Sequence, residues 1–208
     1  SEGGDNHFRE EFLIQLRQLA DENDAFLIYD EVQTGVGLTG KFWSHQHFSE
    51  KARPDIVAFG KKMQVCGILV GSKVDEVSGN VFNVPSRINS TWGGNLVDMV
   101  RSTQILNIVE EDNLCENAAN VGEYLKNNLQ ELATQYDKMS NVRGRGLLCS
   151  FDFPDKDMRN KFIERGMAEN VMFLGCGNQT IRFRPALCIE KQHIDEGIEV
   201  MRKILSTI

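Results

Sequence analysis

The sequence has little of what would place it in a membrane, on a nucleic acid or in a disulfide-bonded fold. Charges or glycines break every apolar run before it reaches the roughly 18–20 residues of a membrane span. Lys and Arg number 23 against 30 Asp and Glu, which argues against a nucleic-acid or anionic-membrane partner. The 5 cysteines form no C-x-x-C pair, so we expect reduced thiols in a cytoplasmic protein.

Further absences concern catalysis and the start of the chain. No serine lies in a nucleophile-elbow pattern, so a Ser-His-Asp hydrolase is not indicated. His45 and His47 have no third ligand cluster after them, so no metal site is predicted. No initiator Met or signal peptide precedes the opening Ser1-Glu2-Gly3-Gly4, and a glycine-rich turn is an unusual start for a whole protein.

What is present is a globular composition over 208 residues, enough for one or two domains and a core without disulfides. Apolar residues recur at helical spacing over residues 12–20, which predicts an amphipathic helix. Continuous apolar runs at 25–29 and 55–59 are typical of strands buried on both faces, and 67–71 is a third candidate strand. We therefore expect an α/β fold with a parallel sheet in this half.

The second half changes from long helices to a smaller α/β unit. Two helices are predicted between residues 95 and 136. The elements expected after them are a strand at 147–153, a helix at 156–169, strands at 171–174 and 181–183, and a helix at 193–205. We place the helices on one side of this sheet and divide the chain into domains at 1–100 and 101–208.

Asp30 and Glu31 end the first predicted strand, where open α/β sheets bind their ligands. One alternative is a phosphate-loop NTPase, because residues 35–41 satisfy G-x-x-x-x-G-K. Phe42 stands where that loop needs a hydroxyl, and the acids follow the wrong strand, so we reject this alternative. Surface acids that merely end a strand remain a second explanation.

Gly60-Lys61 ends the second strand at the same edge. A lysine beside a carboxylate suits a pyridoxal-phosphate (PLP) site, where the lysine bonds the cofactor and the carboxylate keeps its ring nitrogen protonated. Taken alone, the doublet Lys61-Lys62 is equally compatible with a solvated loop.

Two further motifs could bind anions. Residues 89–95, Asn-Ser-Thr-Trp-Gly-Gly-Asn, lead into a long helix and suit a phosphate, although an ordinary helix cap is also possible. On a strand, Arg182 and Arg184 would share one face while Phe183 packs on the other. Such a fork suits a substrate carboxylate, with structural ion pairs as the alternative.

Taken in order, residues 27–35, 55–61, 89–94 and 181–185 resemble the class III (omega) aminotransferases of PLP fold type I. The resemblance covers essentially the whole chain. It implies part of the large three-layer αβα domain followed by the C-terminal small α/β domain. Residues 1–8, 59–67 and 89–95 look most like the branch that transfers the ε-amino group of L-lysine to 2-oxoglutarate. Transfer from 4-aminobutyrate or another omega-amino acid is the alternative.

The resemblance also implies residue roles around the cofactor. Asp30 would pair with the pyridinium nitrogen and Gln33 would hydrogen-bond the ring oxygen. Lys61 would be the Schiff-base lysine and proton shuttle; Lys62 competes for this role, but the preceding Gly60 favours Lys61.

Other roles implied by the resemblance concern substrate and subunits. Ser90 and Thr91 would bind the cofactor phosphate of a neighbouring subunit, so a homodimer with shared sites is expected. Arg182 would bind the carboxylate of 2-oxoglutarate, and Glu2 would mask that arginine when the amino donor binds. Asn89 would touch the substrate.

A complete family member is about twice as long as this chain. The missing N-terminal half normally supplies a phosphate-binding loop and the aromatic residue that stacks on the cofactor. We therefore expect Ser1 to lie inside the large domain, with another segment or chain supplying the rest. The 208 residues alone are expected to be catalytically inert.

Overall fold

The computed structural model describes residues 1–88 and 90–208, which divide into two compact units. Unit 1 comprises Ser1–His7, Gly37–Phe42 and Asn113–Ile208. Unit 2 comprises Phe8–Val36 and Trp43–Asp112. The domain division expected from sequence, 1–100 and 101–208, concerns a longer protein and stays a prediction.

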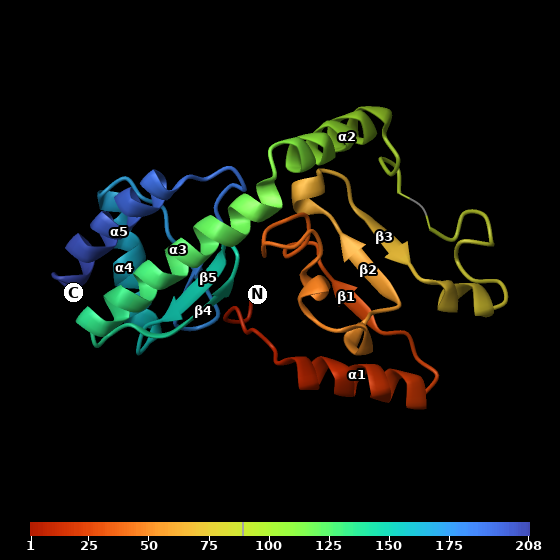
Figure 1. Cartoon of the computed structure of the whole chain (residues 1–208), viewed down its shortest axis with the longest axis horizontal. Coiled ribbons are helices and arrows are strands. Elements are labelled where there is room, and N and C mark those ends of the chain that lie inside the picture. The colour runs from red at the N-terminus through yellow and green to blue at the C-terminus, as the bar shows by residue number, and fades with distance from the viewer. Residues whose placement is uncertain (89) are drawn as a thin grey trace. The chain divides into compact units, whose positions relative to one another are not determined.

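The sheet of unit 2 has three strands in the order β1-β2-β3 (Figure 1). Strand β1 (Ile28–Asp30) is parallel to β2 (Ile56–Phe59), and β3 (Gly67–Val70) is antiparallel to β2. All three strands were predicted, but β1 begins later than expected and the sheet is mixed rather than purely parallel. Helix α1 (Glu10–Glu22) matches the helix predicted from apolar spacing.

The remaining elements of unit 2 are four short 3₁₀ turns and one long helix. The turns are η1 (Ser44–His47), η2 (Glu50–Ala52), η3 (Lys61–Met63) and η4 (Ser72–Glu76). The helix is α2 (Leu96–Glu111), which contacts η3.

Asp55 connects α1 to the sheet. Its Oδ2 accepts hydrogen bonds from Nη1 of Arg17 at 2.6 Å and from the N–H of Leu27 at 2.8 Å. The arginine also pairs with Asp21 one helical turn later, at 2.5 Å. A charged carboxylate with two donors is a strong local tie, and it holds the helix against the segments that lead into β1 and β2.

The strands of unit 2 are less buried than their apolar sequences predict. Val57 is 7% exposed, but Ile28 is 57% exposed and Leu69 is 48% exposed. The prediction that the first strand is buried on both faces is therefore wrong for this chain. The apolar composition suits a strand with cover on both faces, and the described residues leave Ile28 uncovered.

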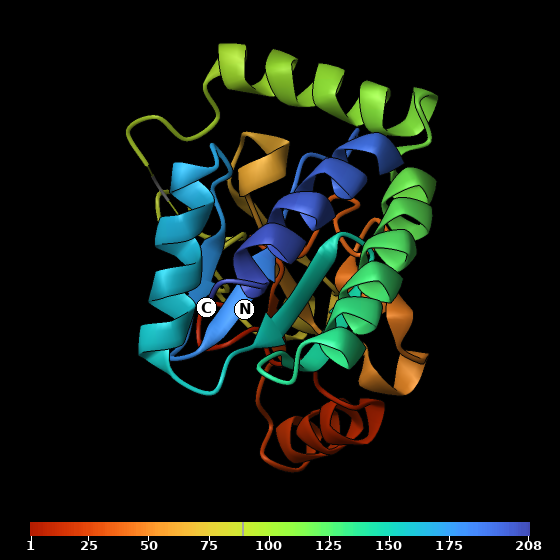
Figure 2. The ribbon, with the colours of Figure 1, turned by 90° about the vertical axis from the view of Figure 1, so that its left-hand side faces the viewer.

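Unit 1 contains an antiparallel sheet in the order β4-β5-β7-β6. Its strands are β4 (Ser140–Arg145), β5 (Leu148–Asp152), β6 (Leu174–Cys176) and β7 (Thr180–Phe183). Its helices are α3 (Leu114–Gln135), α4 (Lys156–Ala168) and α5 (Lys191–Leu205), and they lie on one side of the sheet as predicted (Figure 2). Strand β4 was not predicted. Strand β6 was expected to begin at residue 171 but begins three residues later, at Leu174.

The core of unit 1 lies between this sheet and its helices. Phe151, Phe153 and Phe162 are all 0% exposed, with the ring of Phe151 edge-on to Phe162 at 6.0 Å. Burying each such side chain contributes about 1.5–3 kcal/mol. At Gly122, helix α3 packs directly against the backbone of Gly146, because an added Cβ at Gly122 would lie 2.0 Å from the carbonyl carbon of Gly146.

The segment Gly37–Phe42 packs into this same core. Leu38 is 0% exposed, and its carbonyl accepts the N–H of Leu147 at 3.0 Å. Thr39 is 3% exposed. The G-x-x-x-x-G-K pattern therefore marks a buried packing segment instead of an open phosphate cradle, in agreement with the rejection of an NTPase.

Among the residues that the structure describes, no helix combines the length and apolar character needed to cross a membrane.

Candidate active site

Asp30 and Lys61 lie at one edge of the unit 2 sheet. Strands β1 and β2 are parallel, with Asp30 opposite Ala58, so both strands end at the same edge of the sheet. The N–H of Glu31 still donates to the carbonyl of Ala58 at 2.9 Å, and Lys61 follows three residues further on. The shared edge predicted from the two motifs is observed.

Asp30 is exposed, and its Oδ1 accepts the N–H of Val32 at 3.0 Å. This bond closes a turn directly after β1 and orients the carboxylate at the strand end. Gln33, in the same turn, is 8% exposed. The two residues expected to face the cofactor ring thus come from one short turn at the ligand edge.

Lys61 has a backbone φ of +38°, in the left-handed region that residues with a side chain rarely adopt. Its carbonyl accepts both the N–H and the side-chain amide of Gln64, each at 2.9 Å, which stabilises this conformation. The side chain is exposed, and among the described residues its ammonium group has no hydrogen-bond or ion-pair partner. Lys62 is half-buried.

Glu31, expected beside Asp30 at the ligand-binding end of the strand, is turned into the protein instead. This residue is 3% exposed and accepts hydrogen bonds from the N–H of Ser44 at 2.5 Å and from the N–H of His45 at 2.8 Å. Its Oε1 also lies 2.7 Å from Nδ1 of His45. The carboxylate therefore holds η1 against the end of β1. Its position next to Asp30 was the signal in the sequence, but its partners are separated from it by a loop.

The indole of Trp43, directly before η1, covers the turn that follows Asp30. An added Cβ at Gly35 would lie 2.8 Å from this ring, so only glycine allows the close approach. Trp43 also lies 6.1 Å from the ring of Phe59, between ring centroids. The turn that carries Asp30 and Gln33 is thus packed from behind.

Ser90 and Thr91 are exposed in a turn before α2. They do not cap the helix: the side chain of Asn95 does so by accepting the N–H of Val97 at 2.9 Å. The alternative of an ordinary helix cap therefore holds for Asn95, the last residue of the motif, and phosphate binding by Ser90 and Thr91 stays a prediction. Asn89, the expected substrate contact, lies outside the described residues.

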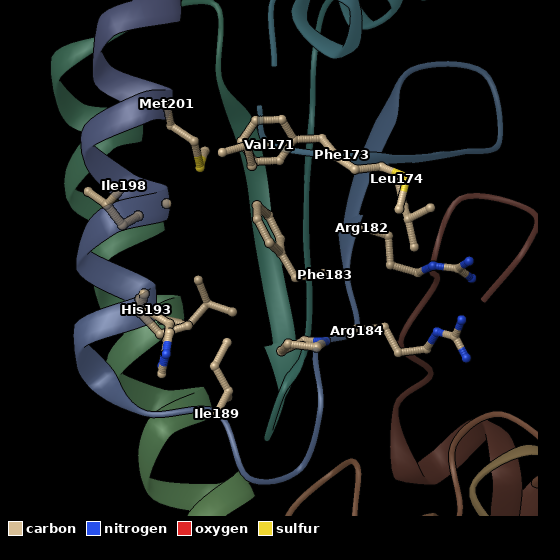
Figure 3. Close-up of a pocket in the computed structure, with 15 residues that line it drawn as sticks. Val171, Phe173, Leu174, Arg182, Phe183, Arg184, Ile189, His193, Ile198 and Met201 are labelled. Atoms are coloured by element: carbon tan, nitrogen blue, oxygen red, sulfur yellow. The ribbon is translucent and has the colours of Figure 1, made fainter. Parts of the chain in front are cut away.

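Arg182 in β7 is 5% exposed, and its Nη1 lies 3.1 Å from Oε1 of Glu2. Arg182 and Arg184 point to the same side, away from Phe183 and α5, as the alternation of a strand predicts (Figure 3). The predicted pairing of Glu2 with Arg182 is thus present as a contact.

A cavity of about 350 Å³ lies beside these arginines, between α5 and the strands β6 and β7 (Figure 3). Its lining is mostly apolar and includes Phe173, Leu174, Phe183, Ile198 and Met201. Because the guanidinium groups point away from α5, this cavity is not where they would bind a substrate carboxylate. Within residues 1–88 and 90–208, no group of three metal-ligating side chains is present.

The profile of the aminotransferase class-III family matches residues 1–205, and the chain belongs to that family. It is 50% identical over 208 residues to the L-lysine-epsilon aminotransferase of Mycobacterium tuberculosis, covering all of this chain and 46% of the relative. It is 38% identical over 207 residues to the human mitochondrial 4-aminobutyrate aminotransferase, covering 99% of this chain and 40% of the relative.

A solved structure of the lysine aminotransferase from M. tuberculosis superposes with a TM-score of 0.95 at 50% identity, covering 99% of this chain and 47% of that one. This confirms the predicted family and the PLP aminotransferase fold. The class III family uses PLP. The chain spans about half the length of these relatives.

Proposed function

We propose that this chain forms part of a PLP-dependent aminotransferase that moves the ε-amino group of L-lysine to 2-oxoglutarate. The products are 2-aminoadipate 6-semialdehyde and glutamate. The placement of Asp30 and Lys61 at one sheet edge carries the proposal. Identity of 44–50% over the length of this chain to L-lysine-epsilon aminotransferases supports the choice of amino donor.

The residues at the edge fit PLP, which when bound supplies an electron sink for cleaving a C–H bond next to nitrogen. Asp30 would keep the ring nitrogen protonated, because a carboxylate favours the charged form of a nearby base. Gln33 would hydrogen-bond the ring oxygen. The side-chain nitrogen of Lys61, which has no partner among the described residues, would bond the cofactor after losing its proton.

With PLP bound, the neutral side-chain amine of Lys61 would take the proton from Cε of the substrate lysine. A general base must be held within hydrogen-bond reach of the proton it removes. The left-handed backbone at Lys61, fixed by Gln64, sets the direction in which this side chain leaves the chain.

Arg182 and Glu2 would handle the different charges of the two substrates. The extra carboxylate of 2-oxoglutarate would bind Arg182 in place of Glu2, and Glu2 would neutralise the arginine when lysine is bound. The 3.1 Å contact between them supports this exchange. Asn89 is retained in the proposal as a substrate contact.

A homodimer is part of the same proposal. Ser90 and Thr91 are exposed, which suits hydroxyls that bind the cofactor phosphate in a partner subunit. Helix α2 beside them presents an unusually apolar surface, with Leu96 81% exposed and Val100 65% exposed. Apolar patches of this kind mark interaction surfaces. A cytoplasmic location, expected from the cysteines, is part of the same proposal.

Two alternatives remain. Identity of 38% to 4-aminobutyrate aminotransferase favours that donor as the second candidate. The 208 residues are inert by themselves if the site needs the half of the relatives' length that this chain does not span.

The first experiment adds PLP to the 208-residue chain, traps any covalent adduct with borohydride and maps the labelled peptide. Label on Lys61, lost in Lys61→Ala and kept in the neighbouring Lys62→Ala, supports the cofactor site. Label on Lys62 instead would contradict the assignment, and no label on either lysine supports the inert alternative.

The second experiment uses the complete enzyme that contains this chain and measures turnover of lysine, ornithine and 4-aminobutyrate with 2-oxoglutarate. We expect lysine to have the highest kcat/KM and Lys61→Ala to abolish turnover. Preference for 4-aminobutyrate would replace the proposed donor, and normal turnover by Lys61→Ala would exclude the mechanism.

A further inference from the structure

The guanidinium of Arg143 in β4 binds the chain segment that carries Glu2. Its Nε donates to the carbonyl of Asp5 at 2.9 Å, and its Nη2 donates to the carbonyl of Gly4. The same Nη2 lies 3.0 Å from Oδ1 of Asp152 and 3.4 Å from Oγ1 of Thr180. One half-buried arginine of β4 thus joins two carbonyls of the N-terminal segment to two other strands of the unit 1 sheet.

Asp152 and its neighbours hold this arginine in place. The hydroxyl of Thr180 donates to Oδ1 of Asp152 at 2.7 Å, and the amide of Asn141 donates to Oδ2 at 2.7 Å. Nη1 of Arg143 also donates to the carbonyl of Asn141 at 2.7 Å. A planar guanidinium fixed on several sides gives a defined geometry that a lysine cannot reproduce.

The N-terminal segment itself forms a closed turn on the sheet. The N–H of Asp5 donates to the carbonyl of Ser1 at 2.8 Å, and the N–H of Gly177 donates to the carbonyl of Glu2 at 2.9 Å. An added Cβ at Gly177 would lie 2.8 Å from Cα of Gly4, so the two backbones are in direct contact. Asp5 is 2% exposed and hydrogen-bonds His7 at 3.3 Å.

The side chain of Glu2, by contrast, is 74% exposed although it contacts the buried Arg182. An exposed glutamate has several rotatable bonds, and an ion pair of this kind by itself contributes little to ordering it. What places its carboxylate near Arg182 is therefore the backbone of the turn, and Arg143 is a side chain that fixes two carbonyls of that turn to the sheet.

We propose that Arg143, supported by Asp152, is a positioning residue that holds Glu2 beside Arg182 and thereby sets how the enzyme discriminates between an amino donor and a dicarboxylate acceptor. The inference rests on the proposed function, because it assumes that Glu2 must neutralise Arg182 when the donor binds. With the turn released, Arg182 stays in β7 and can still bind the second carboxylate of 2-oxoglutarate. Only the donor half-reaction loses a partner that it needs.

The test measures the two half-reactions separately by single-turnover kinetics in the complete enzyme. For Arg143→Met we expect kcat/KM for lysine to fall about tenfold, while that for 2-oxoglutarate changes less than about twofold. Glu2→Gln should give the same split. Arg165→Met, which removes an exposed arginine of α4, is the control and should leave both half-reactions unchanged.

A double variant adds a stricter requirement. If Arg143 acts through Glu2, Glu2→Gln combined with Arg143→Met should be no slower than Glu2→Gln alone. Equal loss in both half-reactions, or additive losses in the double variant, would show a merely structural role and overturn the proposal. Arg143→Lys should fail to restore the donor half-reaction.

Hydrogen exchange supplies a readout that does not depend on activity. In Arg143→Met, exchange should accelerate in the peptide covering residues 1–8 and stay slow in residues 147–153, which report that β5 remains folded. Unchanged protection of residues 1–8 would refute the role of Arg143 whatever the enzyme's substrate. An enzyme inactive with lysine but active with another omega-amino donor would refute only the proposed substrate. The effect of Arg143→Met on kcat/KM would then be compared between that donor and 2-oxoglutarate.

Discussion

Glu31 and His45 are joined twice: Oε1 of the glutamate lies 2.8 Å from the backbone nitrogen of His45 and 2.7 Å from its Nδ1. The glutamate is 3% exposed, so both contacts are shielded from water. Through them the end of β1 and the turn η1 form one packed layer behind Asp30. The sheet edge that carries Asp30 is therefore supported by the buried carboxylate of Glu31.

Replacing Glu31 with alanine should lower the free energy of unfolding by about 2–3 kcal/mol, because the partly buried N–H groups of Ser44 and His45 lose a charged acceptor. Urea denaturation measures the change. Glu50→Ala is the matched control: its ion pair with Arg53 is exposed, at 85% and 71% side-chain exposure, and its loss should be hardly measurable. Equal losses in the two variants would contradict the buried role of Glu31.

Two glycines in helices of unit 1 should respond in opposite directions to alanine. Gly122→Ala places a methyl group 2.0 Å from the backbone of Gly146, so we expect a loss of at least about 1–3 kcal/mol of stability. Gly197 in α5 has no atom within 4 Å of an added Cβ, so Gly197→Ala should stabilise by about 0.5–1 kcal/mol. Thermal and urea unfolding of the two variants will show whether close packing at the helix decides if alanine stabilises or destabilises the protein.

Asp152 should make unit 1 acid-sensitive. Burial opposes its ionisation, but hydrogen bonds from Thr180, Asn141 and Arg143 outweigh that effect and hold the pKa of Asp152 below its ordinary value. Because the unfolded chain then takes up the proton first, stability is fully present above about pH 4 and is lost as the pH falls through the folded pKa.

Unfolding measured between neutral pH and about pH 3 tests this dependence. Asp152→Asn should be less stable at neutral pH and show a shallower loss on acidification than the parent chain. Asp157→Asn, at an exposed position on α4, should retain the parent slope. An unchanged acid slope in Asp152→Asn would show that this carboxylate is not linked to folding.

Cys149 should resist alkylation in the folded protein. Burial raises the pKa of its thiol to about 12, and its Sγ lies 3.3 Å from the carbonyl oxygen of Gly146. Only the thiolate reacts, so at about pH 8 iodoacetamide should modify the exposed Cys66 and Cys188 first and reach Cys149 only on unfolding. Peptide mapping with and without urea measures the order, and early labelling of Cys149 would mean that β5 opens easily.

Patterns within one element were predicted well from sequence. Apolar spacing located α1 and α5 because a helix face depends on residues three and four apart. Strands were harder, because pairing decides where they begin. Strand β6 was expected at 171–174 but lies at Leu174–Cys176, where Gly175 pairs with Ile181. Strand β4 is rich in polar residues and exists through its ladder with β5, so no apolar alternation revealed it.

The sequence by itself determined the family, because four motifs in register name the chemistry even when each motif alone is ambiguous. It also predicted that Asp30 and Lys61 lie at one edge of a sheet, since Asp30 ends β1 and Lys61 comes two residues after the end of β2. The tertiary structure alone decided what supports them. Glu31 finds His45 only when a loop folds back, and Arg143 meets Asp5 across 138 positions of sequence. Hydrogen bonds and close packing between distant segments depend on three-dimensional approach, which residue spacing along the chain does not encode.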